Sequence, residues 1–169
     1  MQRLMTRRIR KSLLVILGFL LVVVLVGPFL VPVPALEGQA PPKELADTDS
    51  RFIDIGDVTV HYKQYGHGEP AFFLLHGTLM TTYTWHEMTE PLARIGTVIA
   101  YDRPAFGLSS RPMPDEWSGK SPNGHEAQAE MLIALMDAFD IDRAILVGNS
   151  LGGGLAALTA RSYPERIED

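Results

Sequence analysis

The hydrophobic positions of this 169-residue chain fall into one long run and several short ones. Residues 13–31 contain only apolar residues, glycine and proline, whereas three runs of about five mostly apolar residues lie near 71–75, 97–101 and 144–148. Each short run breaks into a turn, a pattern that predicts buried parallel strands. Strands of this kind alternating with helices predict an α/β fold, with helices on both faces of a sheet in three layers.

An alternating pattern precedes the first short run. Residues 51–55 and 58–65 flank Gly56 and Asp57, and apolar and polar residues alternate in the second segment. Alternation on either side of a two-residue turn predicts a β-hairpin that leads into the parallel strands. The polar face of this hairpin carries Thr59, His61 and Lys63.

Two helices are expected between the strands. A short one covers about residues 85–94, and a longer one runs from about 126 to 139. Asn123 and Glu126 stand at capping-box spacing ahead of the longer helix. Its apolar side chains recur at helical spacing and fall on one face: Met131, Leu132, Leu135, Met136 and Phe139.

The long apolar run follows a basic segment. Residues 1–12 hold five basic side chains and no acidic one. At about 1.5 Å per residue, a helix over residues 13–31 is long enough to cross the apolar core of a bilayer. We therefore expect a single-pass signal anchor, with the N-terminus in the cytoplasm and the following domain on the extracytoplasmic side of the membrane.

Two alternatives to the anchor stay open. One is a cleaved signal peptide, although residues 31–36 do not supply a clean cleavage site. The other is a buried helix of a soluble domain. In the anchored arrangement, a stiff proline-rich linker over residues 32–50 leads to a domain over residues 51–169.

A glycine-flanked serine lies where the last short run meets a helical segment. Residues 148–152 have the pattern G-x-S-x-G. A serine on a sharp strand-to-helix turn is exposed for nucleophilic attack, and only small residues such as Gly148 and Gly152 fit around it. Ser150 is therefore the candidate nucleophile. A glycine-rich phosphate-binding turn is the alternative, but no P-loop or dinucleotide-binding spacing accompanies it.

The turn after the first short run fits the same chemistry. His76, Gly77 and Thr78 follow that run directly. Acyl transfer places negative charge on a former carbonyl oxygen, which backbone N–H groups can stabilise. The N–H groups of Thr78 and of Leu151, the residue after the serine, are the candidate oxyanion-hole donors. We interpret the side chain of His76 as structural.

The second short run ends in a third motif, and the three motifs together carry a family resemblance. They resemble the α/β-hydrolase fold superfamily over about residues 51–169. Within it, they are similar to serine hydrolases with an HG-x oxyanion turn, a group that contains carboxylesterases and C–C bond hydrolases. The matching residues, in order, are His76, Gly77, Trp85, Asp102, Arg103, Pro104, Gly107, Ser109, Gly148, Asn149, Ser150, Leu151, Gly152 and Gly153.

The resemblance implies a serine hydrolase that forms an acyl-enzyme at Ser150 on an apolar ester or related carbonyl substrate, without a cofactor. It also implies that Asp102 is structural. Serine at the elbow, where an aspartate would otherwise stand, argues against the haloalkane dehalogenase and epoxide hydrolase branches. The chain departs from the family at Ala105, usually glycine, and at Leu79, often a small residue. These departures bear on loop shape and substrate.

The triad partners of the serine have no candidate in the chain. In this family the acid and then the histidine follow the nucleophile, but only nineteen residues follow Ser150 and none is a histidine. We expect surface or turn roles for the five histidines upstream, which are His61, His67, His76, His86 and His125.

We therefore expect the N-terminal half of a hydrolase, truncated after the elbow helix, with the acid and the histidine encoded beyond residue 169. The alternative is a non-catalytic, truncated binding protein of the same fold. A half-sheet would leave the strand near 144–148 as an exposed edge, which predicts aggregation of this chain alone.

Charge and composition exclude other functions. After the first 36 residues, acidic groups outnumber basic ones by ten, which excludes a nucleic-acid binder. The chain has no cysteine and therefore neither disulfides nor thiolate chemistry. No paired histidine or carboxylate spacing predicts a metal site. The expected partners are the membrane and a small-molecule substrate.

Overall fold

The computed structural model describes two units. Contacts between residues divide the chain into a first unit, Met1–Gln39, and a second unit, Ala40–Asp169. Side chains are described from residue 11 onward, and the residues outside the description are 1, 33–37, 39, 114, 118–119 and 169.

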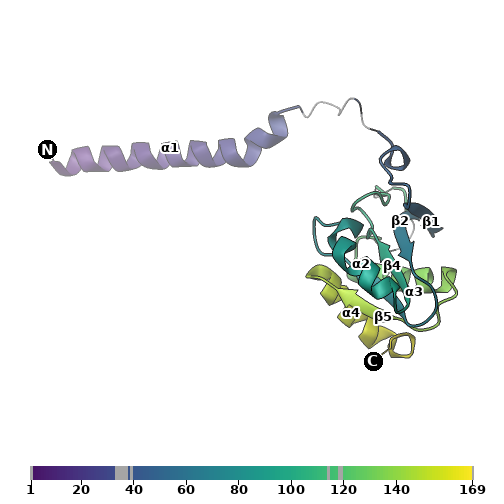
Figure 1. Ribbon diagram of the computed structural model, residues 1–169. Coiled ribbons are helices and arrows are strands. Elements are labelled where there is room, and N and C mark those ends of the chain that lie inside the picture. The colour runs from purple at the N-terminus through teal and green to yellow at the C-terminus, as the bar shows by residue number, and fades with distance from the viewer. Residues whose placement is uncertain (1, 33–37, 39, 114, 118–119, 169) are drawn as a thin grey trace. The chain divides into compact units, whose positions relative to one another are not determined.

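The first unit contains helix α1, Gln2–Leu30 (Figure 1). Its segment Lys11–Leu30 reaches a mean hydropathy of 3.1, and none of it is buried against the protein. By length and composition it could cross a membrane, and no other helix of the described residues could. A signal sequence near an N-terminus has the same properties.

The second unit is built on a mixed sheet (Figure 1) whose strands lie in the order β1-β2-β4-β3-β5. The pairs β1–β2 and β2–β4 are antiparallel, whereas β3 pairs in parallel with β4 and with β5. The predicted hairpin and the three predicted parallel strands are confirmed. The strands are β1 (Arg51–Ile55), β2 (Val58–Tyr65), β3 (Ala71–Leu75), β4 (Thr97–Tyr101) and β5 (Ile145–Gly148).

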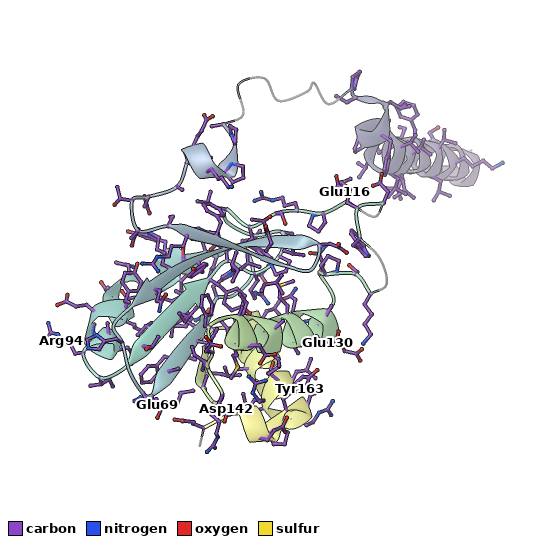
Figure 2. All side chains as sticks on the ribbon, turned by 90° about the vertical axis from the view of Figure 1, so that its right-hand side faces the viewer. Glu69, Arg94, Glu116, Glu130, Asp142 and Tyr163 are labelled. Atoms are coloured by element: carbon purple, nitrogen blue, oxygen red, sulfur yellow. The ribbon has the colours of Figure 1, made fainter. Side chains whose placement is uncertain are left out.

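Helices cover both faces of the sheet, as predicted. Helix α2, His86–Ala93, packs on one face together with the short 3-10 helix Thr82–Trp85. Helices α3, His125–Ala138, and α4, Leu151–Ser162, lie side by side on the other face (Figure 2). Two further 3-10 helices are Pro42–Glu44 and Pro164–Arg166.

A hydrophobic core lies on each face of the sheet, and alternate side chains of one strand contribute to the two cores. In β3, Phe73 and Leu75 join the core beneath α3 and α4, whereas Phe72 and Leu74 join the core beneath α2. Strand β3 is buried throughout because β4 and β5 flank it. Strand β5 is the outer strand and is half-buried to exposed, so the expected open edge is confirmed for residues 145–148. Ala144, just before the strand, is instead buried and bridged to Ile167.

Two details of the sequence analysis are wrong. His61, expected on a polar surface, is only 2% exposed, because the segment before β1 and the turn after β4 cover its ring. The Nε2 atom of His61 lies 2.9 Å from Ser50 Oγ in that segment. The capping box ahead of α3 is absent, since Gly124 is the N-cap residue and no side chain caps the helix.

Candidate active site

Ser150 lies on a strained turn between β5 and α4. Its backbone has φ 52° and ψ −119°, a conformation that non-glycine residues seldom adopt. Strain of this kind persists where the surrounding structure holds it, and it concentrates at functional sites. Ser150 is the N-cap residue of α4, but its side chain accepts no capping hydrogen bond. The hydroxyl is therefore not used to stabilise the helix.

Close backbone contacts explain the glycines of the turn. A Cβ on Gly152 would overlap the carbonyl oxygen of Leu75, at the end of β3. A Cβ on Gly148 would lie 2.5 Å from the carbonyl oxygen of Gly152. The N–H of Asn149 donates to Leu75 O at 3.0 Å. The G-x-S-x-G pattern thus has a steric cause, because the elbow is packed against the end of β3.

His76, which follows β3, is fully buried with both ring nitrogens engaged. Its Nε2 accepts the backbone N–H of Arg103 at 2.9 Å, and its Nδ1 donates to the carbonyl oxygen of Gly77 at 2.7 Å. Because a backbone N–H can only donate, Nε2 carries no proton and Nδ1 carries it. Burial lowers the pKa of His76, so the ring is neutral at neutral pH.

The hydrogen bond from His76 Nδ1 to the carbonyl oxygen of Gly77 fixes the direction of the Gly77–Thr78 peptide group. In a trans peptide the C=O of Gly77 and the N–H of Thr78 point in opposite directions. The N–H of Thr78 therefore points away from the imidazole of His76. Gly77 itself borders the elbow, since a Cβ on it would lie 3.1 Å from Ser150 Cβ. Within the described residues, neither Thr78 nor Leu151 donates its N–H to a backbone carbonyl.

Asp102, at the end of β4, is 1% exposed and is surrounded by donors. Its Oδ1 accepts a hydrogen bond from the backbone N–H of Thr82 at 2.7 Å. Its Oδ2 accepts hydrogen bonds from the backbone N–H of Leu108 at 2.9 Å and from the Nδ1–H of His61 at 2.7 Å. Burial would raise the pKa of Asp102, but the hydrogen bonds from these three groups outweigh it and lower the pKa. A Cβ on Gly107 would overlap this carboxylate.

Comparison with known proteins identifies the family. A model of the alpha/beta hydrolase fold family matches residues 70–168, more than half of the chain. The chain belongs to this family. It is 37% identical over 118 residues to the 2-hydroxy-6-oxo-6-phenylhexa-2,4-dienoate hydrolase of Comamonas testosteroni, a match that covers 68% of this chain and 39% of that enzyme.

Solved structures of other family members agree. A meta-cleavage product hydrolase superposes with a TM-score of 0.62 and 32% identity, covering 70% of this chain and 42% of that one. An N-acyl homoserine lactone degrading enzyme superposes with a TM-score of 0.60 and 30% identity, covering 69% and 42%. The chain thus spans about two fifths of the length of these α/β hydrolases.

The two departures from the α/β-hydrolase pattern share one backbone property. Ala105 has φ 66° and Leu79 has φ 57°, both in the left-handed region that favours glycine. A glycine, usual in the family at position 105, would adopt this conformation without a steric penalty. In this chain the backbone keeps the conformation although alanine stands at position 105.

In the described part of this α/β-hydrolase chain, no histidine is hydrogen-bonded to Ser150. His61 is committed to Asp102 and Ser50, and His76 to its own turn. The surface positions predicted for the remaining histidines are confirmed, since His67, His86 and His125 are exposed. The described residues also contain no group of three or more histidines and carboxylates that could hold a metal ion.

A cavity of about 330 Å³ lies beside Asp102, and Ser150 is not among its lining residues. It is bordered by the segment before β1, by β2 and by α2. Lys63, which lines it, is paired with two carboxylates, because its Nζ lies 2.6 Å from a carboxylate oxygen of Asp47 and 2.8 Å from one of Asp49. The cavity is therefore separate from the elbow and is not where a substrate would meet Ser150.

Sequence reasoning missed the burial of Arg103, which it treated only as part of a turn. This arginine is 2% exposed, its guanidinium lies 5.2 Å from the ring centre of Phe106, and its Nη1 donates to Gln128 Oε1 at 3.3 Å. Its Nε has no partner among the described residues, and burial lowers its pKa. The sequence around Arg103 does not indicate this burial, because its hydrogen-bond partner Gln128 lies in α3, far away in the sequence.

Proposed function

We propose that this chain is the nucleophile-bearing part of a serine hydrolase that acts on an ester or related carbonyl substrate through an acyl-enzyme at Ser150. One observation carries the proposal. The strained serine, whose hydroxyl is not used for capping, lies next to Gly77, and the carbonyl of Gly77 is turned toward His76. This proximity of the proposed nucleophile to the proposed oxyanion turn supports the assignment.

The proposed reaction follows from these groups. Ser150 Oγ attacks the substrate carbonyl carbon while a base removes its proton, and the carbonyl oxygen becomes an oxyanion. The N–H groups of Thr78 and Leu151 donate to this oxyanion, and each such donor is worth about 3 kcal/mol in the transition state. Expulsion of the leaving group gives the acyl-enzyme, which water then hydrolyses.

The base and the acid of the proposed triad lie outside residues 1–169. The imidazoles of His61 and His76 are both engaged elsewhere, and neither contacts Ser150. The family order of serine, acid and histidine places both partners after the elbow. The shorter span of this chain relative to the hydrolases that it matches agrees with this arrangement.

The proposed substrate class is a small carbonyl compound with an apolar part. The names of the relatives fit it, since one hydrolyses a 2-hydroxy-6-oxo dienoate that bears a phenyl group and another degrades an N-acyl homoserine lactone. Ester, lactone and C–C bond hydrolysis all begin with addition to a carbonyl group. Within that class, we propose that the substrate of this chain is an ester or a related carbonyl compound.

We also propose that α1 anchors the hydrolase in a membrane, with the N-terminus in the cytoplasm and the catalytic part on the extracytoplasmic side. The mean hydropathy of 3.1 over Lys11–Leu30 and the preceding basic residues support this. Alkaline carbonate extraction and protease treatment of intact cells test it. Release of the full-length chain by carbonate would count against an anchor.

A non-catalytic binding protein of the same fold is the second candidate. The observation that favours it is that no imidazole contacts Ser150 in the described part of the chain. A protein of this kind would bind apolar carbonyl compounds without turning them over.

Covalent labelling separates the two candidates. Protein expressed from the native coding region, sequenced past the codon for Asp169, is treated with a fluorophosphonate probe, and the labelled peptide is identified by mass spectrometry. We expect label on Ser150 in the wild type and in the control Ser162→Ala, at the far end of α4, but not in Ser150→Ala. The 169-residue chain by itself should remain unlabelled at Ser150. Absence of label on the folded full-length protein would favour the binding protein.

A further inference from the structure

A serine, a histidine and an aspartate form a hydrogen-bonded chain beside the segment that precedes β1. Ser50 Oγ lies 2.9 Å from Nε2 of His61, and Nδ1 of His61 lies 2.7 Å from Oδ2 of Asp102. These are the contacts of a Ser-His-Asp triad, in which the serine bonds to Nε2 and a buried acid bonds to Nδ1. The chain involves neither Ser150 nor the elbow.

The direction of each hydrogen bond follows from its partners. The carboxylate of Asp102 can only accept, so Nδ1 of His61 carries the proton and Nε2 of the neutral ring is an acceptor. The hydroxyl of Ser50 therefore donates to Nε2, and its oxygen accepts the backbone N–H of Asp47 at 3.2 Å. A serine hydroxyl that donates to an imidazole able to take its proton is in the arrangement that activates a nucleophile.

The three side chains open into the cavity of about 330 Å³, since all of them line it together with Lys63. A pocket of this volume accommodates a small molecule. Burial would lower the pKa of Lys63, but its bonds to Asp47 and Asp49 outweigh burial and raise the pKa, so the ammonium group is charged. A fixed ammonium group can stabilise the negative charge that an attacked carbonyl oxygen acquires.

This arrangement does not depend on what covers the open edge of the sheet at β5. Strands β3 and β4 lie between β5 and β2, the strand that carries His61. Within the described residues, His61 is 2% exposed and Asp102 is 1% exposed. Further strands added at β5 would therefore leave the hydrogen bonds of Ser50, His61 and Asp102 in place.

We propose that Ser50 is a second nucleophile of this protein, which takes the acyl group of a small activated ester with His61 as its base and Asp102 as the acid that orients the ring. Ser50 Oγ bonds to the carbonyl carbon, and its proton passes to His61 Nε2. The bond between that carbon and the ester oxygen then breaks, and the leaving oxygen takes the proton from His61. Water attacks the acyl-serine, with its proton passing through the same ring, and releases the carboxylic acid and free Ser50.

The test uses full-length protein that carries Ser150→Ala, so that the elbow serine cannot react. It is mixed with p-nitrophenyl acetate, p-nitrophenolate release is followed, and acid-quenched samples are digested with trypsin and examined by mass spectrometry for acetylated peptides. The peptide of interest is 44–51, which contains two hydroxyl side chains, Thr48 and Ser50. Ser50→Ala and His61→Gln are compared in this background with the control Thr48→Ala, an exposed threonine in the same peptide.

We expect release of p-nitrophenolate and acetylation of Ser50 in the Ser150→Ala protein. Ser50→Ala should abolish both, and His61→Gln should slow the release about 100-fold, the loss typical of a general base, whereas Thr48→Ala should react at the parent rate. If His61→Gln does not fold, the comparison of Ser50→Ala with Thr48→Ala still decides.

Equal release with and without the Ser50 hydroxyl would show that the three residues form a structural hydrogen-bond chain, and the inference would be wrong. The inference does not rest on the proposed function. Fluorophosphonate labelling of Ser150 in the wild type decides that function separately, so either proposal can fail while the other stands.

Discussion

The imidazole of His76 holds the carbonyl oxygen of Gly77 at 2.7 Å through Nδ1. The other ring nitrogen is held by the backbone N–H of Arg103, at the start of the turn that follows β4. One buried ring thus connects two loops at the carboxyl end of the sheet and sets the direction of the Gly77–Thr78 peptide. In the proposed mechanism that peptide supplies an oxyanion donor, so the orientation of a backbone group depends on a side chain that does not touch the substrate.

If the proposed reaction is correct, replacement of His76 by alanine should lower kcat of the full-length protein about 100-fold with little change in KM, the size expected for loss of one oxyanion donor. Without Nδ1, the Gly77–Thr78 peptide can rotate and the N–H of Thr78 loses its direction. Asparagine can place its amide nitrogen near the position of Nδ1, so His76→Asn should recover much of the lost rate. Equal rates for the alanine variant and wild type would contradict this positioning role.

The pH dependence of stability should report the neutral state of His76. Burial lowers the pKa of His76 from the ordinary value of 6.5, so the folded protein binds fewer protons than the unfolded chain just below that pH. The stabilising contribution is therefore fully present above pH 6.5 and is lost as pH falls from 6.5 through the lowered pKa. Chemical denaturation at a series of pH values measures this. The decline between pH 6.5 and 5 should be smaller in His76→Asn, which has no imidazole at this position.

Loss of the Asp102 carboxylate should destabilise the fold strongly. Asp102→Ala leaves the N–H groups of Thr82 and Leu108 and the ring of His61 buried without their acceptor, at a cost of about 3–5 kcal/mol. Asp102→Asn keeps one acceptor oxygen and should cost about 1–3 kcal/mol. Denaturant titration checks both against Asp142→Asn, an exposed aspartate (Figure 2) where we expect less than about 0.5 kcal/mol.

The elbow could be predicted from sequence because its requirements are local. A Cβ on Gly148 would collide with the backbone of Gly152, four residues away, and a Cβ on Gly152 would collide with the end of β3. Strands β3, β4 and β5 were equally accessible, because an apolar run of about five residues between turn residues is too short for a buried helix and is typical of a buried strand. The same local reasoning placed α3 to within one residue of its observed bounds.

The environment of His61 could not be predicted, because it depends on strand order. An alternating strand in a sheet with one face in water exposes its polar residues on that face, and the pattern of β2 is typical of such a strand. In the structure β4 crosses over to pair with β2, and Ser50 closes the other side, so His61 becomes an internal partner of Asp102. Neither contact leaves a signal within the hairpin itself.

The left-handed backbone at Ala105 should be relieved by glycine. We expect Ala105→Gly to raise the free energy of unfolding by about 0.5–1 kcal/mol, because the Cβ penalty at φ 66° exceeds the entropy that glycine adds to the unfolded chain. The matched control is Ala157→Gly, an exposed alanine within α4, which should lower it by about 0.5–1 kcal/mol. Destabilisation of similar size at both positions would show that the turn holds no strain.

Two glycines of the same helix should respond to alanine in opposite directions. In Gly152→Ala the new methyl group would overlap the carbonyl oxygen of Leu75, so β3 and the elbow must separate, at a cost of about 3 kcal/mol. In Gly154→Ala the methyl group meets nothing within 4 Å, and the better helix former should stabilise α4 by about 1 kcal/mol.

Fluorophosphonate labelling of the same two variants then tests the site directly. Displacement of the elbow in Gly152→Ala moves Ser150 relative to Thr78, so the labelling rate should fall at least tenfold at temperatures where the protein remains folded. Gly154→Ala should label at the wild-type rate, because the first turn of α4 is unchanged. If Gly152→Ala folds as stably as wild type, the contact between the elbow and the end of β3 is not what requires glycine, and the steric account of the G-x-S-x-G pattern in this chain is wrong.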